Sequence, residues 1–303
     1  MVSTNPKMNK ERGKKRWEIL KTALSENVLS PQASTFSGFQ GYSLFTVQKY
    51  EKYEEEQHDY FLYEFEGQRF LVRQRKLGNT FLSKEELFCS DNTGNIRIWP
   101  SEEVLGYFML ENSPLIKNSK TVIELGAGMS GIGAMCVALI NPSCNVWITD
   151  GNTNCVRNLQ KIVEVNKQEG FLDMGTNIQV CELLWQNLEQ IESLNFFFDL
   201  VIIADCLFKE EFHESLINLL DFIVASEGMC IILAPSRGGS KNRFLNKIKE
   251  GKQFIFTQEM RFDERLWEKH SMLLEEMEKH SYEPMNHYPS LIKLSRNANK
   301  FQE

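Results

Sequence analysis

The sequence lacks any long apolar run. No stretch of its 303 residues reaches the roughly 18 consecutive apolar positions that a membrane-crossing helix needs. The segment from Met1 to Arg16 is polar and basic, without the apolar centre of a signal peptide. We therefore expect no membrane partner and a cytoplasmic or nuclear location.

A basic excess is also missing. The formal net charge is −7 and the isoelectric point is about 5.5. A general nucleic-acid binder carries a surplus of lysine and arginine over its binding domain. The composition therefore predicts no nucleic-acid partner.

Paired cysteines and abundant prolines are absent as well. The seven cysteines are odd in number and include no C-x-x-C pair. That pattern indicates neither a disulfide framework nor a zinc site, and no metal is expected. Only 8 prolines accompany 42% hydrophobic and 25% charged residues, which is the composition of an ordinary globular protein with a sizeable core.

The length allows two domains, although α/β folds of about 200 to 250 residues often form one. Residues 91–303 are predicted to form the main domain. Residues 1–90 are predicted to form an N-terminal extension and a small β-rich lobe. Within the extension, the segment from Lys14 to Leu24 has the apolar spacing of a short helix. Docking on the main domain and binding of an acidic partner are both open functions for that helix.

The lobe itself is predicted from Tyr42 to Cys89, where apolar and polar residues alternate as in antiparallel strands. The pair Glu66-Gly67 offers a turn. A basic cluster follows that turn and is interpreted either as a solvated face or as a contact for an acidic partner. Its members are Arg69, Arg73, Arg75 and Lys76.

The stretch from Thr121 to Met135, T-V-I-E-L-G-A-G-M-S-G-I-G-A-M, is the centre of the chain. Strand-forming residues lead into closely spaced glycines and then into a helix start. Glycines allow positive φ angles and close approach of a ligand, and a helix N-terminus offers unpaired N–H groups. The pattern predicts a nucleotide-like ligand.

The identity of that ligand depends on Glu124. The glycine spacing also fits G-x-G-x-x-G, so an NAD-dependent oxidoreductase is a rival interpretation. A carboxylate two residues before Gly126 would repel a pyrophosphate and would suit a cationic ligand. S-adenosylmethionine carries positive charge on its sulfonium and ammonium groups, and we predict it as the cofactor.

Apolar strands alternate with amphipathic helices after the glycine stretch. Strands are expected at 145–150, 178–185, 198–205 and 228–235, with helices at 132–140, 152–168 and 210–224. Such alternation predicts a parallel sheet covered on both faces, and ligands of such sheets lie beyond the carboxyl ends of the strands. The predicted fold is α/β and doubly wound, with two further strands completing seven.

Candidate site residues stand at those strand ends. Asp150 lies 22 residues after Gly128, where a carboxylate can accept hydrogen bonds from ribose hydroxyls; capping of the next helix is its structural alternative. Trp185 is either core or a neighbour of the adenine. Asp205 closes an apolar strand, where a carboxylate has little structural use beyond capping a helix, and is assigned to the site.

The motifs W-P-S-E-E-V-L, E-L-G-A-G, T-D-G-N, E-L-L-W and A-D-C-L-F occur in this order. Together they resemble the class I seven-β-strand protein-lysine methyltransferases, whose fold is Rossmann-like. Within that family, D-N-T-G-N-I-R-I-W-P-S-E-E-V-L, A-P-S-R-G-G and H-Y-P are similar to the calmodulin-lysine N-methyltransferases. The resemblance implies calmodulin as the protein substrate, and repeated methylation is expected.

The resemblance also implies residue roles. Phe208 and Asp205 would lie on the acceptor side, with phenylalanine standing where many relatives have tyrosine, so no hydroxyl hydrogen bond can act there. A monomer is expected. A binding module that kept the fold without catalysis is the second rival interpretation. The implied cofactor contacts are Trp99, Glu124, Gly126, Gly128, Asp150, Trp185 and Ala204.

Overall fold

The computed structural model describes residues 39, 41–76, 98–276 and 281–297. All of these residues belong to a single compact unit, which begins at Phe39. The predicted helix from Lys14 to Leu24 lies outside the described residues. The predicted domain boundary at residue 90 also lies outside them, so that boundary stays a prediction.

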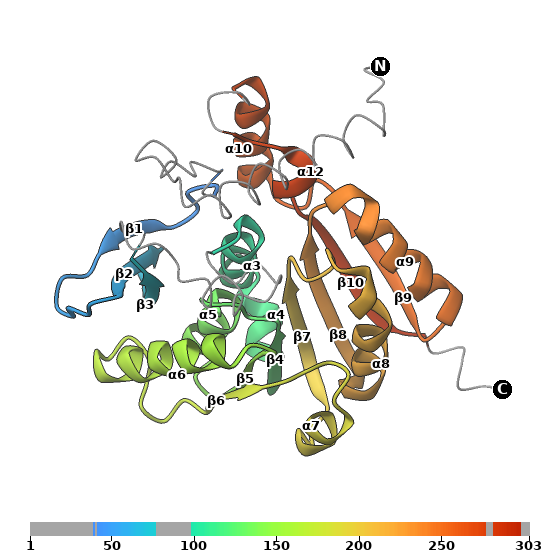
Figure 1. Ribbon diagram of the computed structural model, residues 1–303, viewed down its shortest axis with the longest axis horizontal. Helices are drawn as coiled ribbons and strands as arrows, with labels where there is room; N and C mark the ends of the chain where they lie inside the picture. Colours follow the sequence, from blue (N-terminus) through green and yellow to red (C-terminus); the bar gives the residue numbers. More distant parts are fainter. Residues whose placement is uncertain (1–38, 40, 77–97, 277–280, 298–303) are drawn as a thin grey trace, which may run out of the picture. The chain divides into compact units, whose positions relative to one another are not determined.

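A seven-stranded sheet forms the centre of the unit, in the order β6-β5-β4-β7-β8-β10-β9 (Figure 1). The first five of these strands are parallel, and β10 pairs antiparallel with both β8 and β9. This arrangement confirms the predicted doubly wound fold. The strands are β4 (Thr121–Leu125), β5 (Asn145–Asp150), β6 (Ile178–Glu182), β7 (Phe198–Ala204), β8 (Val224–Ala234), β9 (Phe254–Glu259) and β10 (Ser290–Arg296).

Two hydrophobic clusters cover the two faces of this sheet. Alternate residues of one strand join different clusters: Val122 of β4 packs with the first and Ile123 with the second. The first cluster includes residues of α3, α5 and α6, and the second includes residues of α8 and α9 (Figure 1). Strands buried on both faces explain the nearly continuous apolar runs of the sequence.

The helices fill the connections between strands. The helices that precede β6 in the chain are α3 (Pro100–Glu111), α4 (Ser113–Asn118), α5 (Ile132–Ile140) and α6 (Thr153–Gln168). The helices that follow β6 are α7 (Leu188–Ser193), α8 (His213–Ile223), α9 (Ser240–Gly251), α10 (Glu264–Glu275) and α12 (Pro284–His287). Two 3-10 turns precede α8 and α9, namely η2 (Glu210–Phe212) and η3 (Arg237–Gly239).

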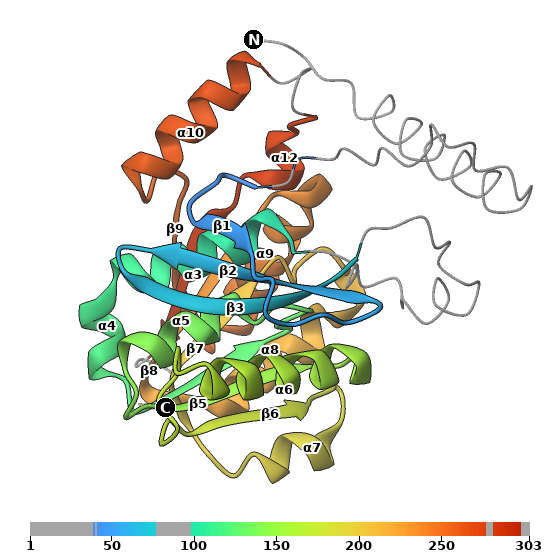
Figure 2. The ribbon, with the colours of Figure 1, turned by 90° about the vertical axis from the view of Figure 1, so that its left-hand side faces the viewer.

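A second, antiparallel sheet of three strands precedes α3. Its strands are β1 (Thr46–Lys49), β2 (His58–Phe65) and β3 (Gln68–Arg75). The predicted turn between β2 and β3 is confirmed, and both Glu66 and Gly67 have positive φ, as a two-residue hairpin favours. Figure 2 shows β3 alongside α6. The side chain of Asn166 on α6 pairs with the N–H and the C=O of Leu71 on β3.

Two absences hold for the part of the chain that the structure describes. None of its helices is long and apolar enough to cross a membrane. Within the same ranges, no group of three or more His, Cys, Asp or Glu side chains is arranged to hold a metal ion.

Candidate active site

The glycine turn joins β4 to α5, as predicted. Gly126 and Gly128 have φ angles of 66° and 60°, in the left-handed region that glycine adopts without steric cost. A Cβ on Gly126 would lie 2.6 Å from the sulfur of Cys206. The turn therefore excludes side chains at Gly126 both by its backbone angle and by its neighbour.

Asp150 at the end of β5 is bonded to this turn. One carboxylate oxygen accepts the N–H of Gly128 at 2.8 Å, and the other accepts the N–H of Asn152 at 2.8 Å. Asn152 itself caps α6, because its side-chain oxygen accepts the N–H of Asn154 at 2.8 Å. The capping function considered for Asp150 thus belongs to Asn152, and the carboxylate of Asp150 borders the cavity.

Glu124 lies beneath the turn. Its side chain is 1% exposed and accepts the N–H of Ala134 in the first turn of α5 at 2.7 Å. Burial raises the pKa of this carboxyl group to about 8. Glu124 is not among the residues that line the cavity, so its predicted cofactor contact stays a prediction.

Glu102 is a cavity residue that sequence reasoning missed. Its carboxylate accepts the N–H of Trp99 at 3.0 Å and the hydroxyl hydrogen of Ser130. Burial raises the pKa of Glu102 to about 8, and nearby Asp205 and Asp150 act in the same direction. The W-P-S-E sequence was the available signal, because Glu102 stands three residues after Trp99, and a glutamate three residues after a helix cap reaches back to the cap's N–H.

The helix α3 begins two residues earlier than a cap at Ser101 would place it. The sequence favours Ser101 as the cap, but Trp99 occupies the N-cap position and Pro100 the first helical position. The hydroxyl of Ser101 is buried and finds no hydrogen-bond partner among the described residues. Proline explains the shift, because it is preferred at the first helical position, where no N–H is needed.

Asp205 and Arg237, which both line the cavity, form an ion pair. Asp205 follows β7 and Arg237 follows β8, two parallel neighbours whose carboxyl ends coincide. Arg237 donates to both carboxylate oxygens of Asp205, with Nε 3.0 Å from Oδ1. Its guanidinium also lies 4.8 Å from the ring centroid of Trp99, in cation–π contact.

The backbone at this pair is unusual. Asp205 has a φ angle of 54° and Arg237 one of 45°, in a region that costs a non-glycine residue about 1–2 kcal/mol. Two such residues in one ion pair at a strand end are typical of a functional site. Arg237 was not among the predicted site residues, although the A-P-S-R-G-G motif contains it.

Aromatic side chains form the outer wall. Phe208 is 38% exposed and lines the cavity. The rings of Trp185 and Phe212 meet edge to face with centroids 6.2 Å apart, and the ammonium group of Lys209 lies 5.4 Å from the ring centroid of Phe212. The nearby thiol of Cys206 is no candidate nucleophile, because burial raises its pKa well above the usual value.

These features meet in one cavity of about 350 Å³, a size typical of small-ligand sites. Every predicted site residue except Glu124 lines it. Glu102, Asp150 and Asp205 give its wall three carboxyl groups; that of Glu102 has a raised pKa, and that of Asp205 is paired with Arg237. The lining residues that were not predicted are Glu102, Gly151, Asn152, Leu183, Leu184, Gln186, Cys206, Lys209, Phe212 and Arg237.

Comparison with known proteins identifies the family of this chain. A sequence model of the lysine methyltransferase family matches residues 83–251. The calmodulin-lysine N-methyltransferase of Arabidopsis thaliana is 33% identical over 209 residues, covering 68% of this chain and 66% of that protein. Protein-lysine N-methyltransferase EFM3 of Chaetomium thermophilum is 29% identical over 161 residues, covering 51% of this chain and 46% of that protein. The chain spans less than two thirds of the length of both relatives.

A solved structure, described as cofactor-bound Rv0187 from MTB, covers 70% of this chain and 87% of its own. Its sequence identity is 15% and its TM-score is 0.46.

The strand order and the glycine turn define a class I methyltransferase fold, in which S-adenosyl-L-methionine is the cofactor. The family match extends over more than half of the chain, and the chain therefore belongs to the lysine methyltransferase family. The roles of individual cofactor and acceptor residues remain predictions.

Proposed function

We propose that this lysine methyltransferase acts on calmodulin and methylates one lysine repeatedly, up to the trimethyl form. The substrate is supported by the 33% identity to a plant calmodulin-lysine N-methyltransferase and by the motif resemblance. The observation that supports the proposed site is the shared cavity, which is lined by Asp150 and the glycine turn together with Asp205 and Phe208.

When bound, the cofactor would supply a methyl group on a positively charged sulfur. The lysine nitrogen would bond to the methyl carbon in line as the carbon–sulfur bond breaks, with S-adenosylhomocysteine as the leaving group. Positioning is then the main task of the protein. In the proposal, Asp150 accepts the ribose hydroxyls, and Asp205 orients the amine. Phe208 faces the carbon stem of the lysine or its methylated ammonium group, an attraction of cation–π type.

The acceptor lysine must also lose a proton, since its unperturbed pKa is about 10.4. Removal from water lowers the pKa of a lysine, and the aromatic wall of Trp185, Phe208 and Phe212 supplies an apolar entrance. Asp205 shares its carboxylate with Arg237. A carboxylate has about four acceptor sites, so two oxygens bonded to a guanidinium can still receive an amine hydrogen.

The contact surface for an acidic partner needs revision. The predicted basic cluster included Arg73, yet that side chain is only 16% exposed and is paired with Glu55. Lys76 donates to the backbone oxygen of Glu55 and lies 3.9 Å from Asp59. Arg73 and Lys76 are therefore engaged within the lobe. A protein of net charge −7 must use local basic residues to meet an acidic substrate. Of the predicted cluster, exposed Arg69 and half-buried Arg75 are the members left for testing.

The decisive experiment is transfer of labelled methyl groups from S-adenosylmethionine to purified calmodulin, followed by mass spectrometry of the modified lysine. The expected result is one lysine carrying up to three methyl groups. Transfer to a different protein in a cell extract, with none to calmodulin, would remove this substrate and leave the lysine methyltransferase assignment standing. Cofactor binding without transfer to any protein would favour the non-catalytic alternative.

A further inference from the structure

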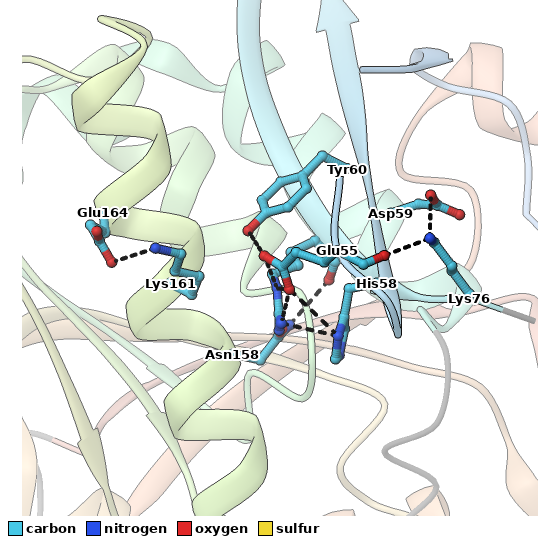
Figure 3. A network of polar contacts seen from close by, with 9 residues as sticks. Glu55, His58, Asp59, Tyr60, Lys76, Asn158, Lys161 and Glu164 are labelled. Carbon is cyan, nitrogen blue, oxygen red and sulfur yellow. Dashed lines mark hydrogen bonds and ion pairs between the residues drawn. The ribbon is translucent and has the colours of Figure 1, made fainter. Parts of the chain in front are cut away.

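Arg73 is held inside a polar network between the three-stranded sheet and α6. Figure 3 shows this network. Arg73 Nε lies 3.0 Å from a carboxylate oxygen of Glu55, and Nη2 lies 3.0 Å from Nδ1 of His58. Its Nη1 donates at 2.6 Å to the side-chain oxygen of Asn158 on α6. The guanidinium thus connects the small sheet to a helix of the main fold.

Asn158 extends the network to the glycine turn. Its side chain is buried, and its amide nitrogen donates to the backbone oxygen of Met129 at 2.7 Å and to that of Arg73 at 3.1 Å. Met129 stands between Gly128 and Ser130, within the turn that borders the cavity. One buried amide therefore joins β3 of the small sheet to the turn expected to hold the cofactor.

The partners of Asn158 define one orientation of its amide. A cationic donor faces the oxygen, and two backbone oxygens face the nitrogen. Rotating the amide by half a turn would place its oxygen against two acceptors and its NH₂ against a guanidinium. The guanidinium of Arg73 therefore reinforces the orientation in which Asn158 donates to Met129.

We propose that Asn158 is a positioning residue for cofactor binding, and that Arg73 of the small sheet fixes its amide. The small sheet is then part of the scaffold of the cofactor site. This inference rests on the cofactor site within the proposed function and is independent of which protein is methylated.

Asn166 provides a control for the possibility that Asn158 has a purely structural role. Asn166 lies on the same helix, is also buried, and joins α6 to β3 by accepting the N–H of Leu71 at 2.7 Å and donating to its oxygen at 2.8 Å. Asn166 docks the sheet without contacting the glycine turn. If docking alone mattered, both asparagines would have the same effect on cofactor affinity.

The test uses the matched substitutions Asn158→Asp and Asn166→Asp in the full chain. Each keeps an acceptor oxygen and removes the donated hydrogen bonds. Aspartate at 158 can still pair with Arg73, but it places an oxygen against the oxygen of Met129. Affinity for S-adenosylmethionine is measured by calorimetry without protein substrate, melting is measured without cofactor, and KM and kcat are measured with the best methyl acceptor.

We expect Asn158→Asp to raise the Kd and the KM for S-adenosylmethionine roughly five- to tenfold, the value of one lost hydrogen bond, with kcat changed less than about twofold. Asn166→Asp should lower the melting temperature and leave the cofactor Kd within about twofold. Equal affinity losses in both variants, or normal affinity in folded Asn158→Asp, would overturn the proposal.

If Asn158→Asp does not fold, a second pair of variants tests the same proposal. Arg73→Met releases the amide of Asn158, whereas Arg69→Met removes an exposed arginine from the same strand. The first should weaken cofactor binding roughly two- to fivefold, and the second should not weaken it. The same affinity in both variants would refute the role of Arg73.

Discussion

Replacement of Asp150 by alanine gives the sharpest test of the cofactor site. Each carboxylate oxygen accepts one backbone N–H at 2.8 Å, from Gly128 or from Asn152, and an oxygen can accept a second hydrogen bond. Two ribose hydroxyls would then contribute about 1–1.5 kcal/mol each. A loss of about 2–3 kcal/mol corresponds to a Kd for S-adenosylmethionine raised roughly 30- to 160-fold.

The same substitution also removes the two backbone contacts, so the cofactor-free protein should lose about 1–3 kcal/mol of stability. Calorimetric titration and chemical denaturation of the cofactor-free protein measure the two effects separately. A ligand analogue isolates the ribose contact further. The 2′-deoxy form of S-adenosylhomocysteine should bind less tightly than the parent compound in the wild-type protein, and this difference should shrink in Asp150→Ala.

Two results would refute the reasoning about Asp150. One is an unchanged Kd in a folded Asp150→Ala protein. The other is a 2′-deoxy penalty that is as large in the variant as in the wild type, which would mean that the carboxylate acts only by holding Gly128.

Other positions give predictions of different kinds. Asp205→Asn should keep S-adenosylmethionine affinity within about twofold and lower the rate constant of methyl transfer at least tenfold in single-turnover assays, because its predicted contact is with the acceptor; a parallel loss of affinity would move Asp205 to the cofactor side. Gly126→Ala should cost about 1–2 kcal/mol in denaturant titrations from its φ of 66° alone, and its Cβ, 2.6 Å from the Cys206 sulfur, should weaken cofactor binding in calorimetry as well; wild-type stability would contradict the turn geometry. Glu102 has a pKa raised to about 8, above its unfolded value, so its contribution to stability is complete below the unfolded pKa and is lost as pH rises towards 8. Denaturant titrations from pH 5 to 9 should show that the free energy of unfolding falls less for Glu102→Gln than for the wild type. The same dependence of that free energy on pH in both proteins would argue against a raised pKa at Glu102.

Local sequence patterns were sufficient for the elements that carry the site. The strand at Asn145–Asp150 has the predicted bounds, because a short apolar run ending in a carboxylate is a local signal. The glycine turn after Glu124 was also predictable, since positive φ angles at Gly126 and Gly128 restrict the residue type. Parallel strand order then places Asp150 and Asp205 at one edge of the sheet.

Long-range partners could not be predicted in the same way. The sequence places Arg73 in a basic cluster, but only the packing of β3 against α6 directs its guanidinium to Asn158, 85 residues further along the chain. The pairing of Arg237 with Asp205 likewise requires β7 and β8 to be neighbours.

The amino-acid sequence by itself determined the α/β fold, the glycine turn and the acidic residues that end the strands, because backbone conformation and hydrophobic periodicity are properties of adjacent residues. Only the tertiary structure decided how those groups are used. It buried Glu124 beneath the turn, placed Glu102 in the cavity wall and turned Arg73 inward. A buried charged side chain needs a partner from a segment that packs beside it. Distant segments become neighbours only when the chain folds, so the sequence alone does not name that partner.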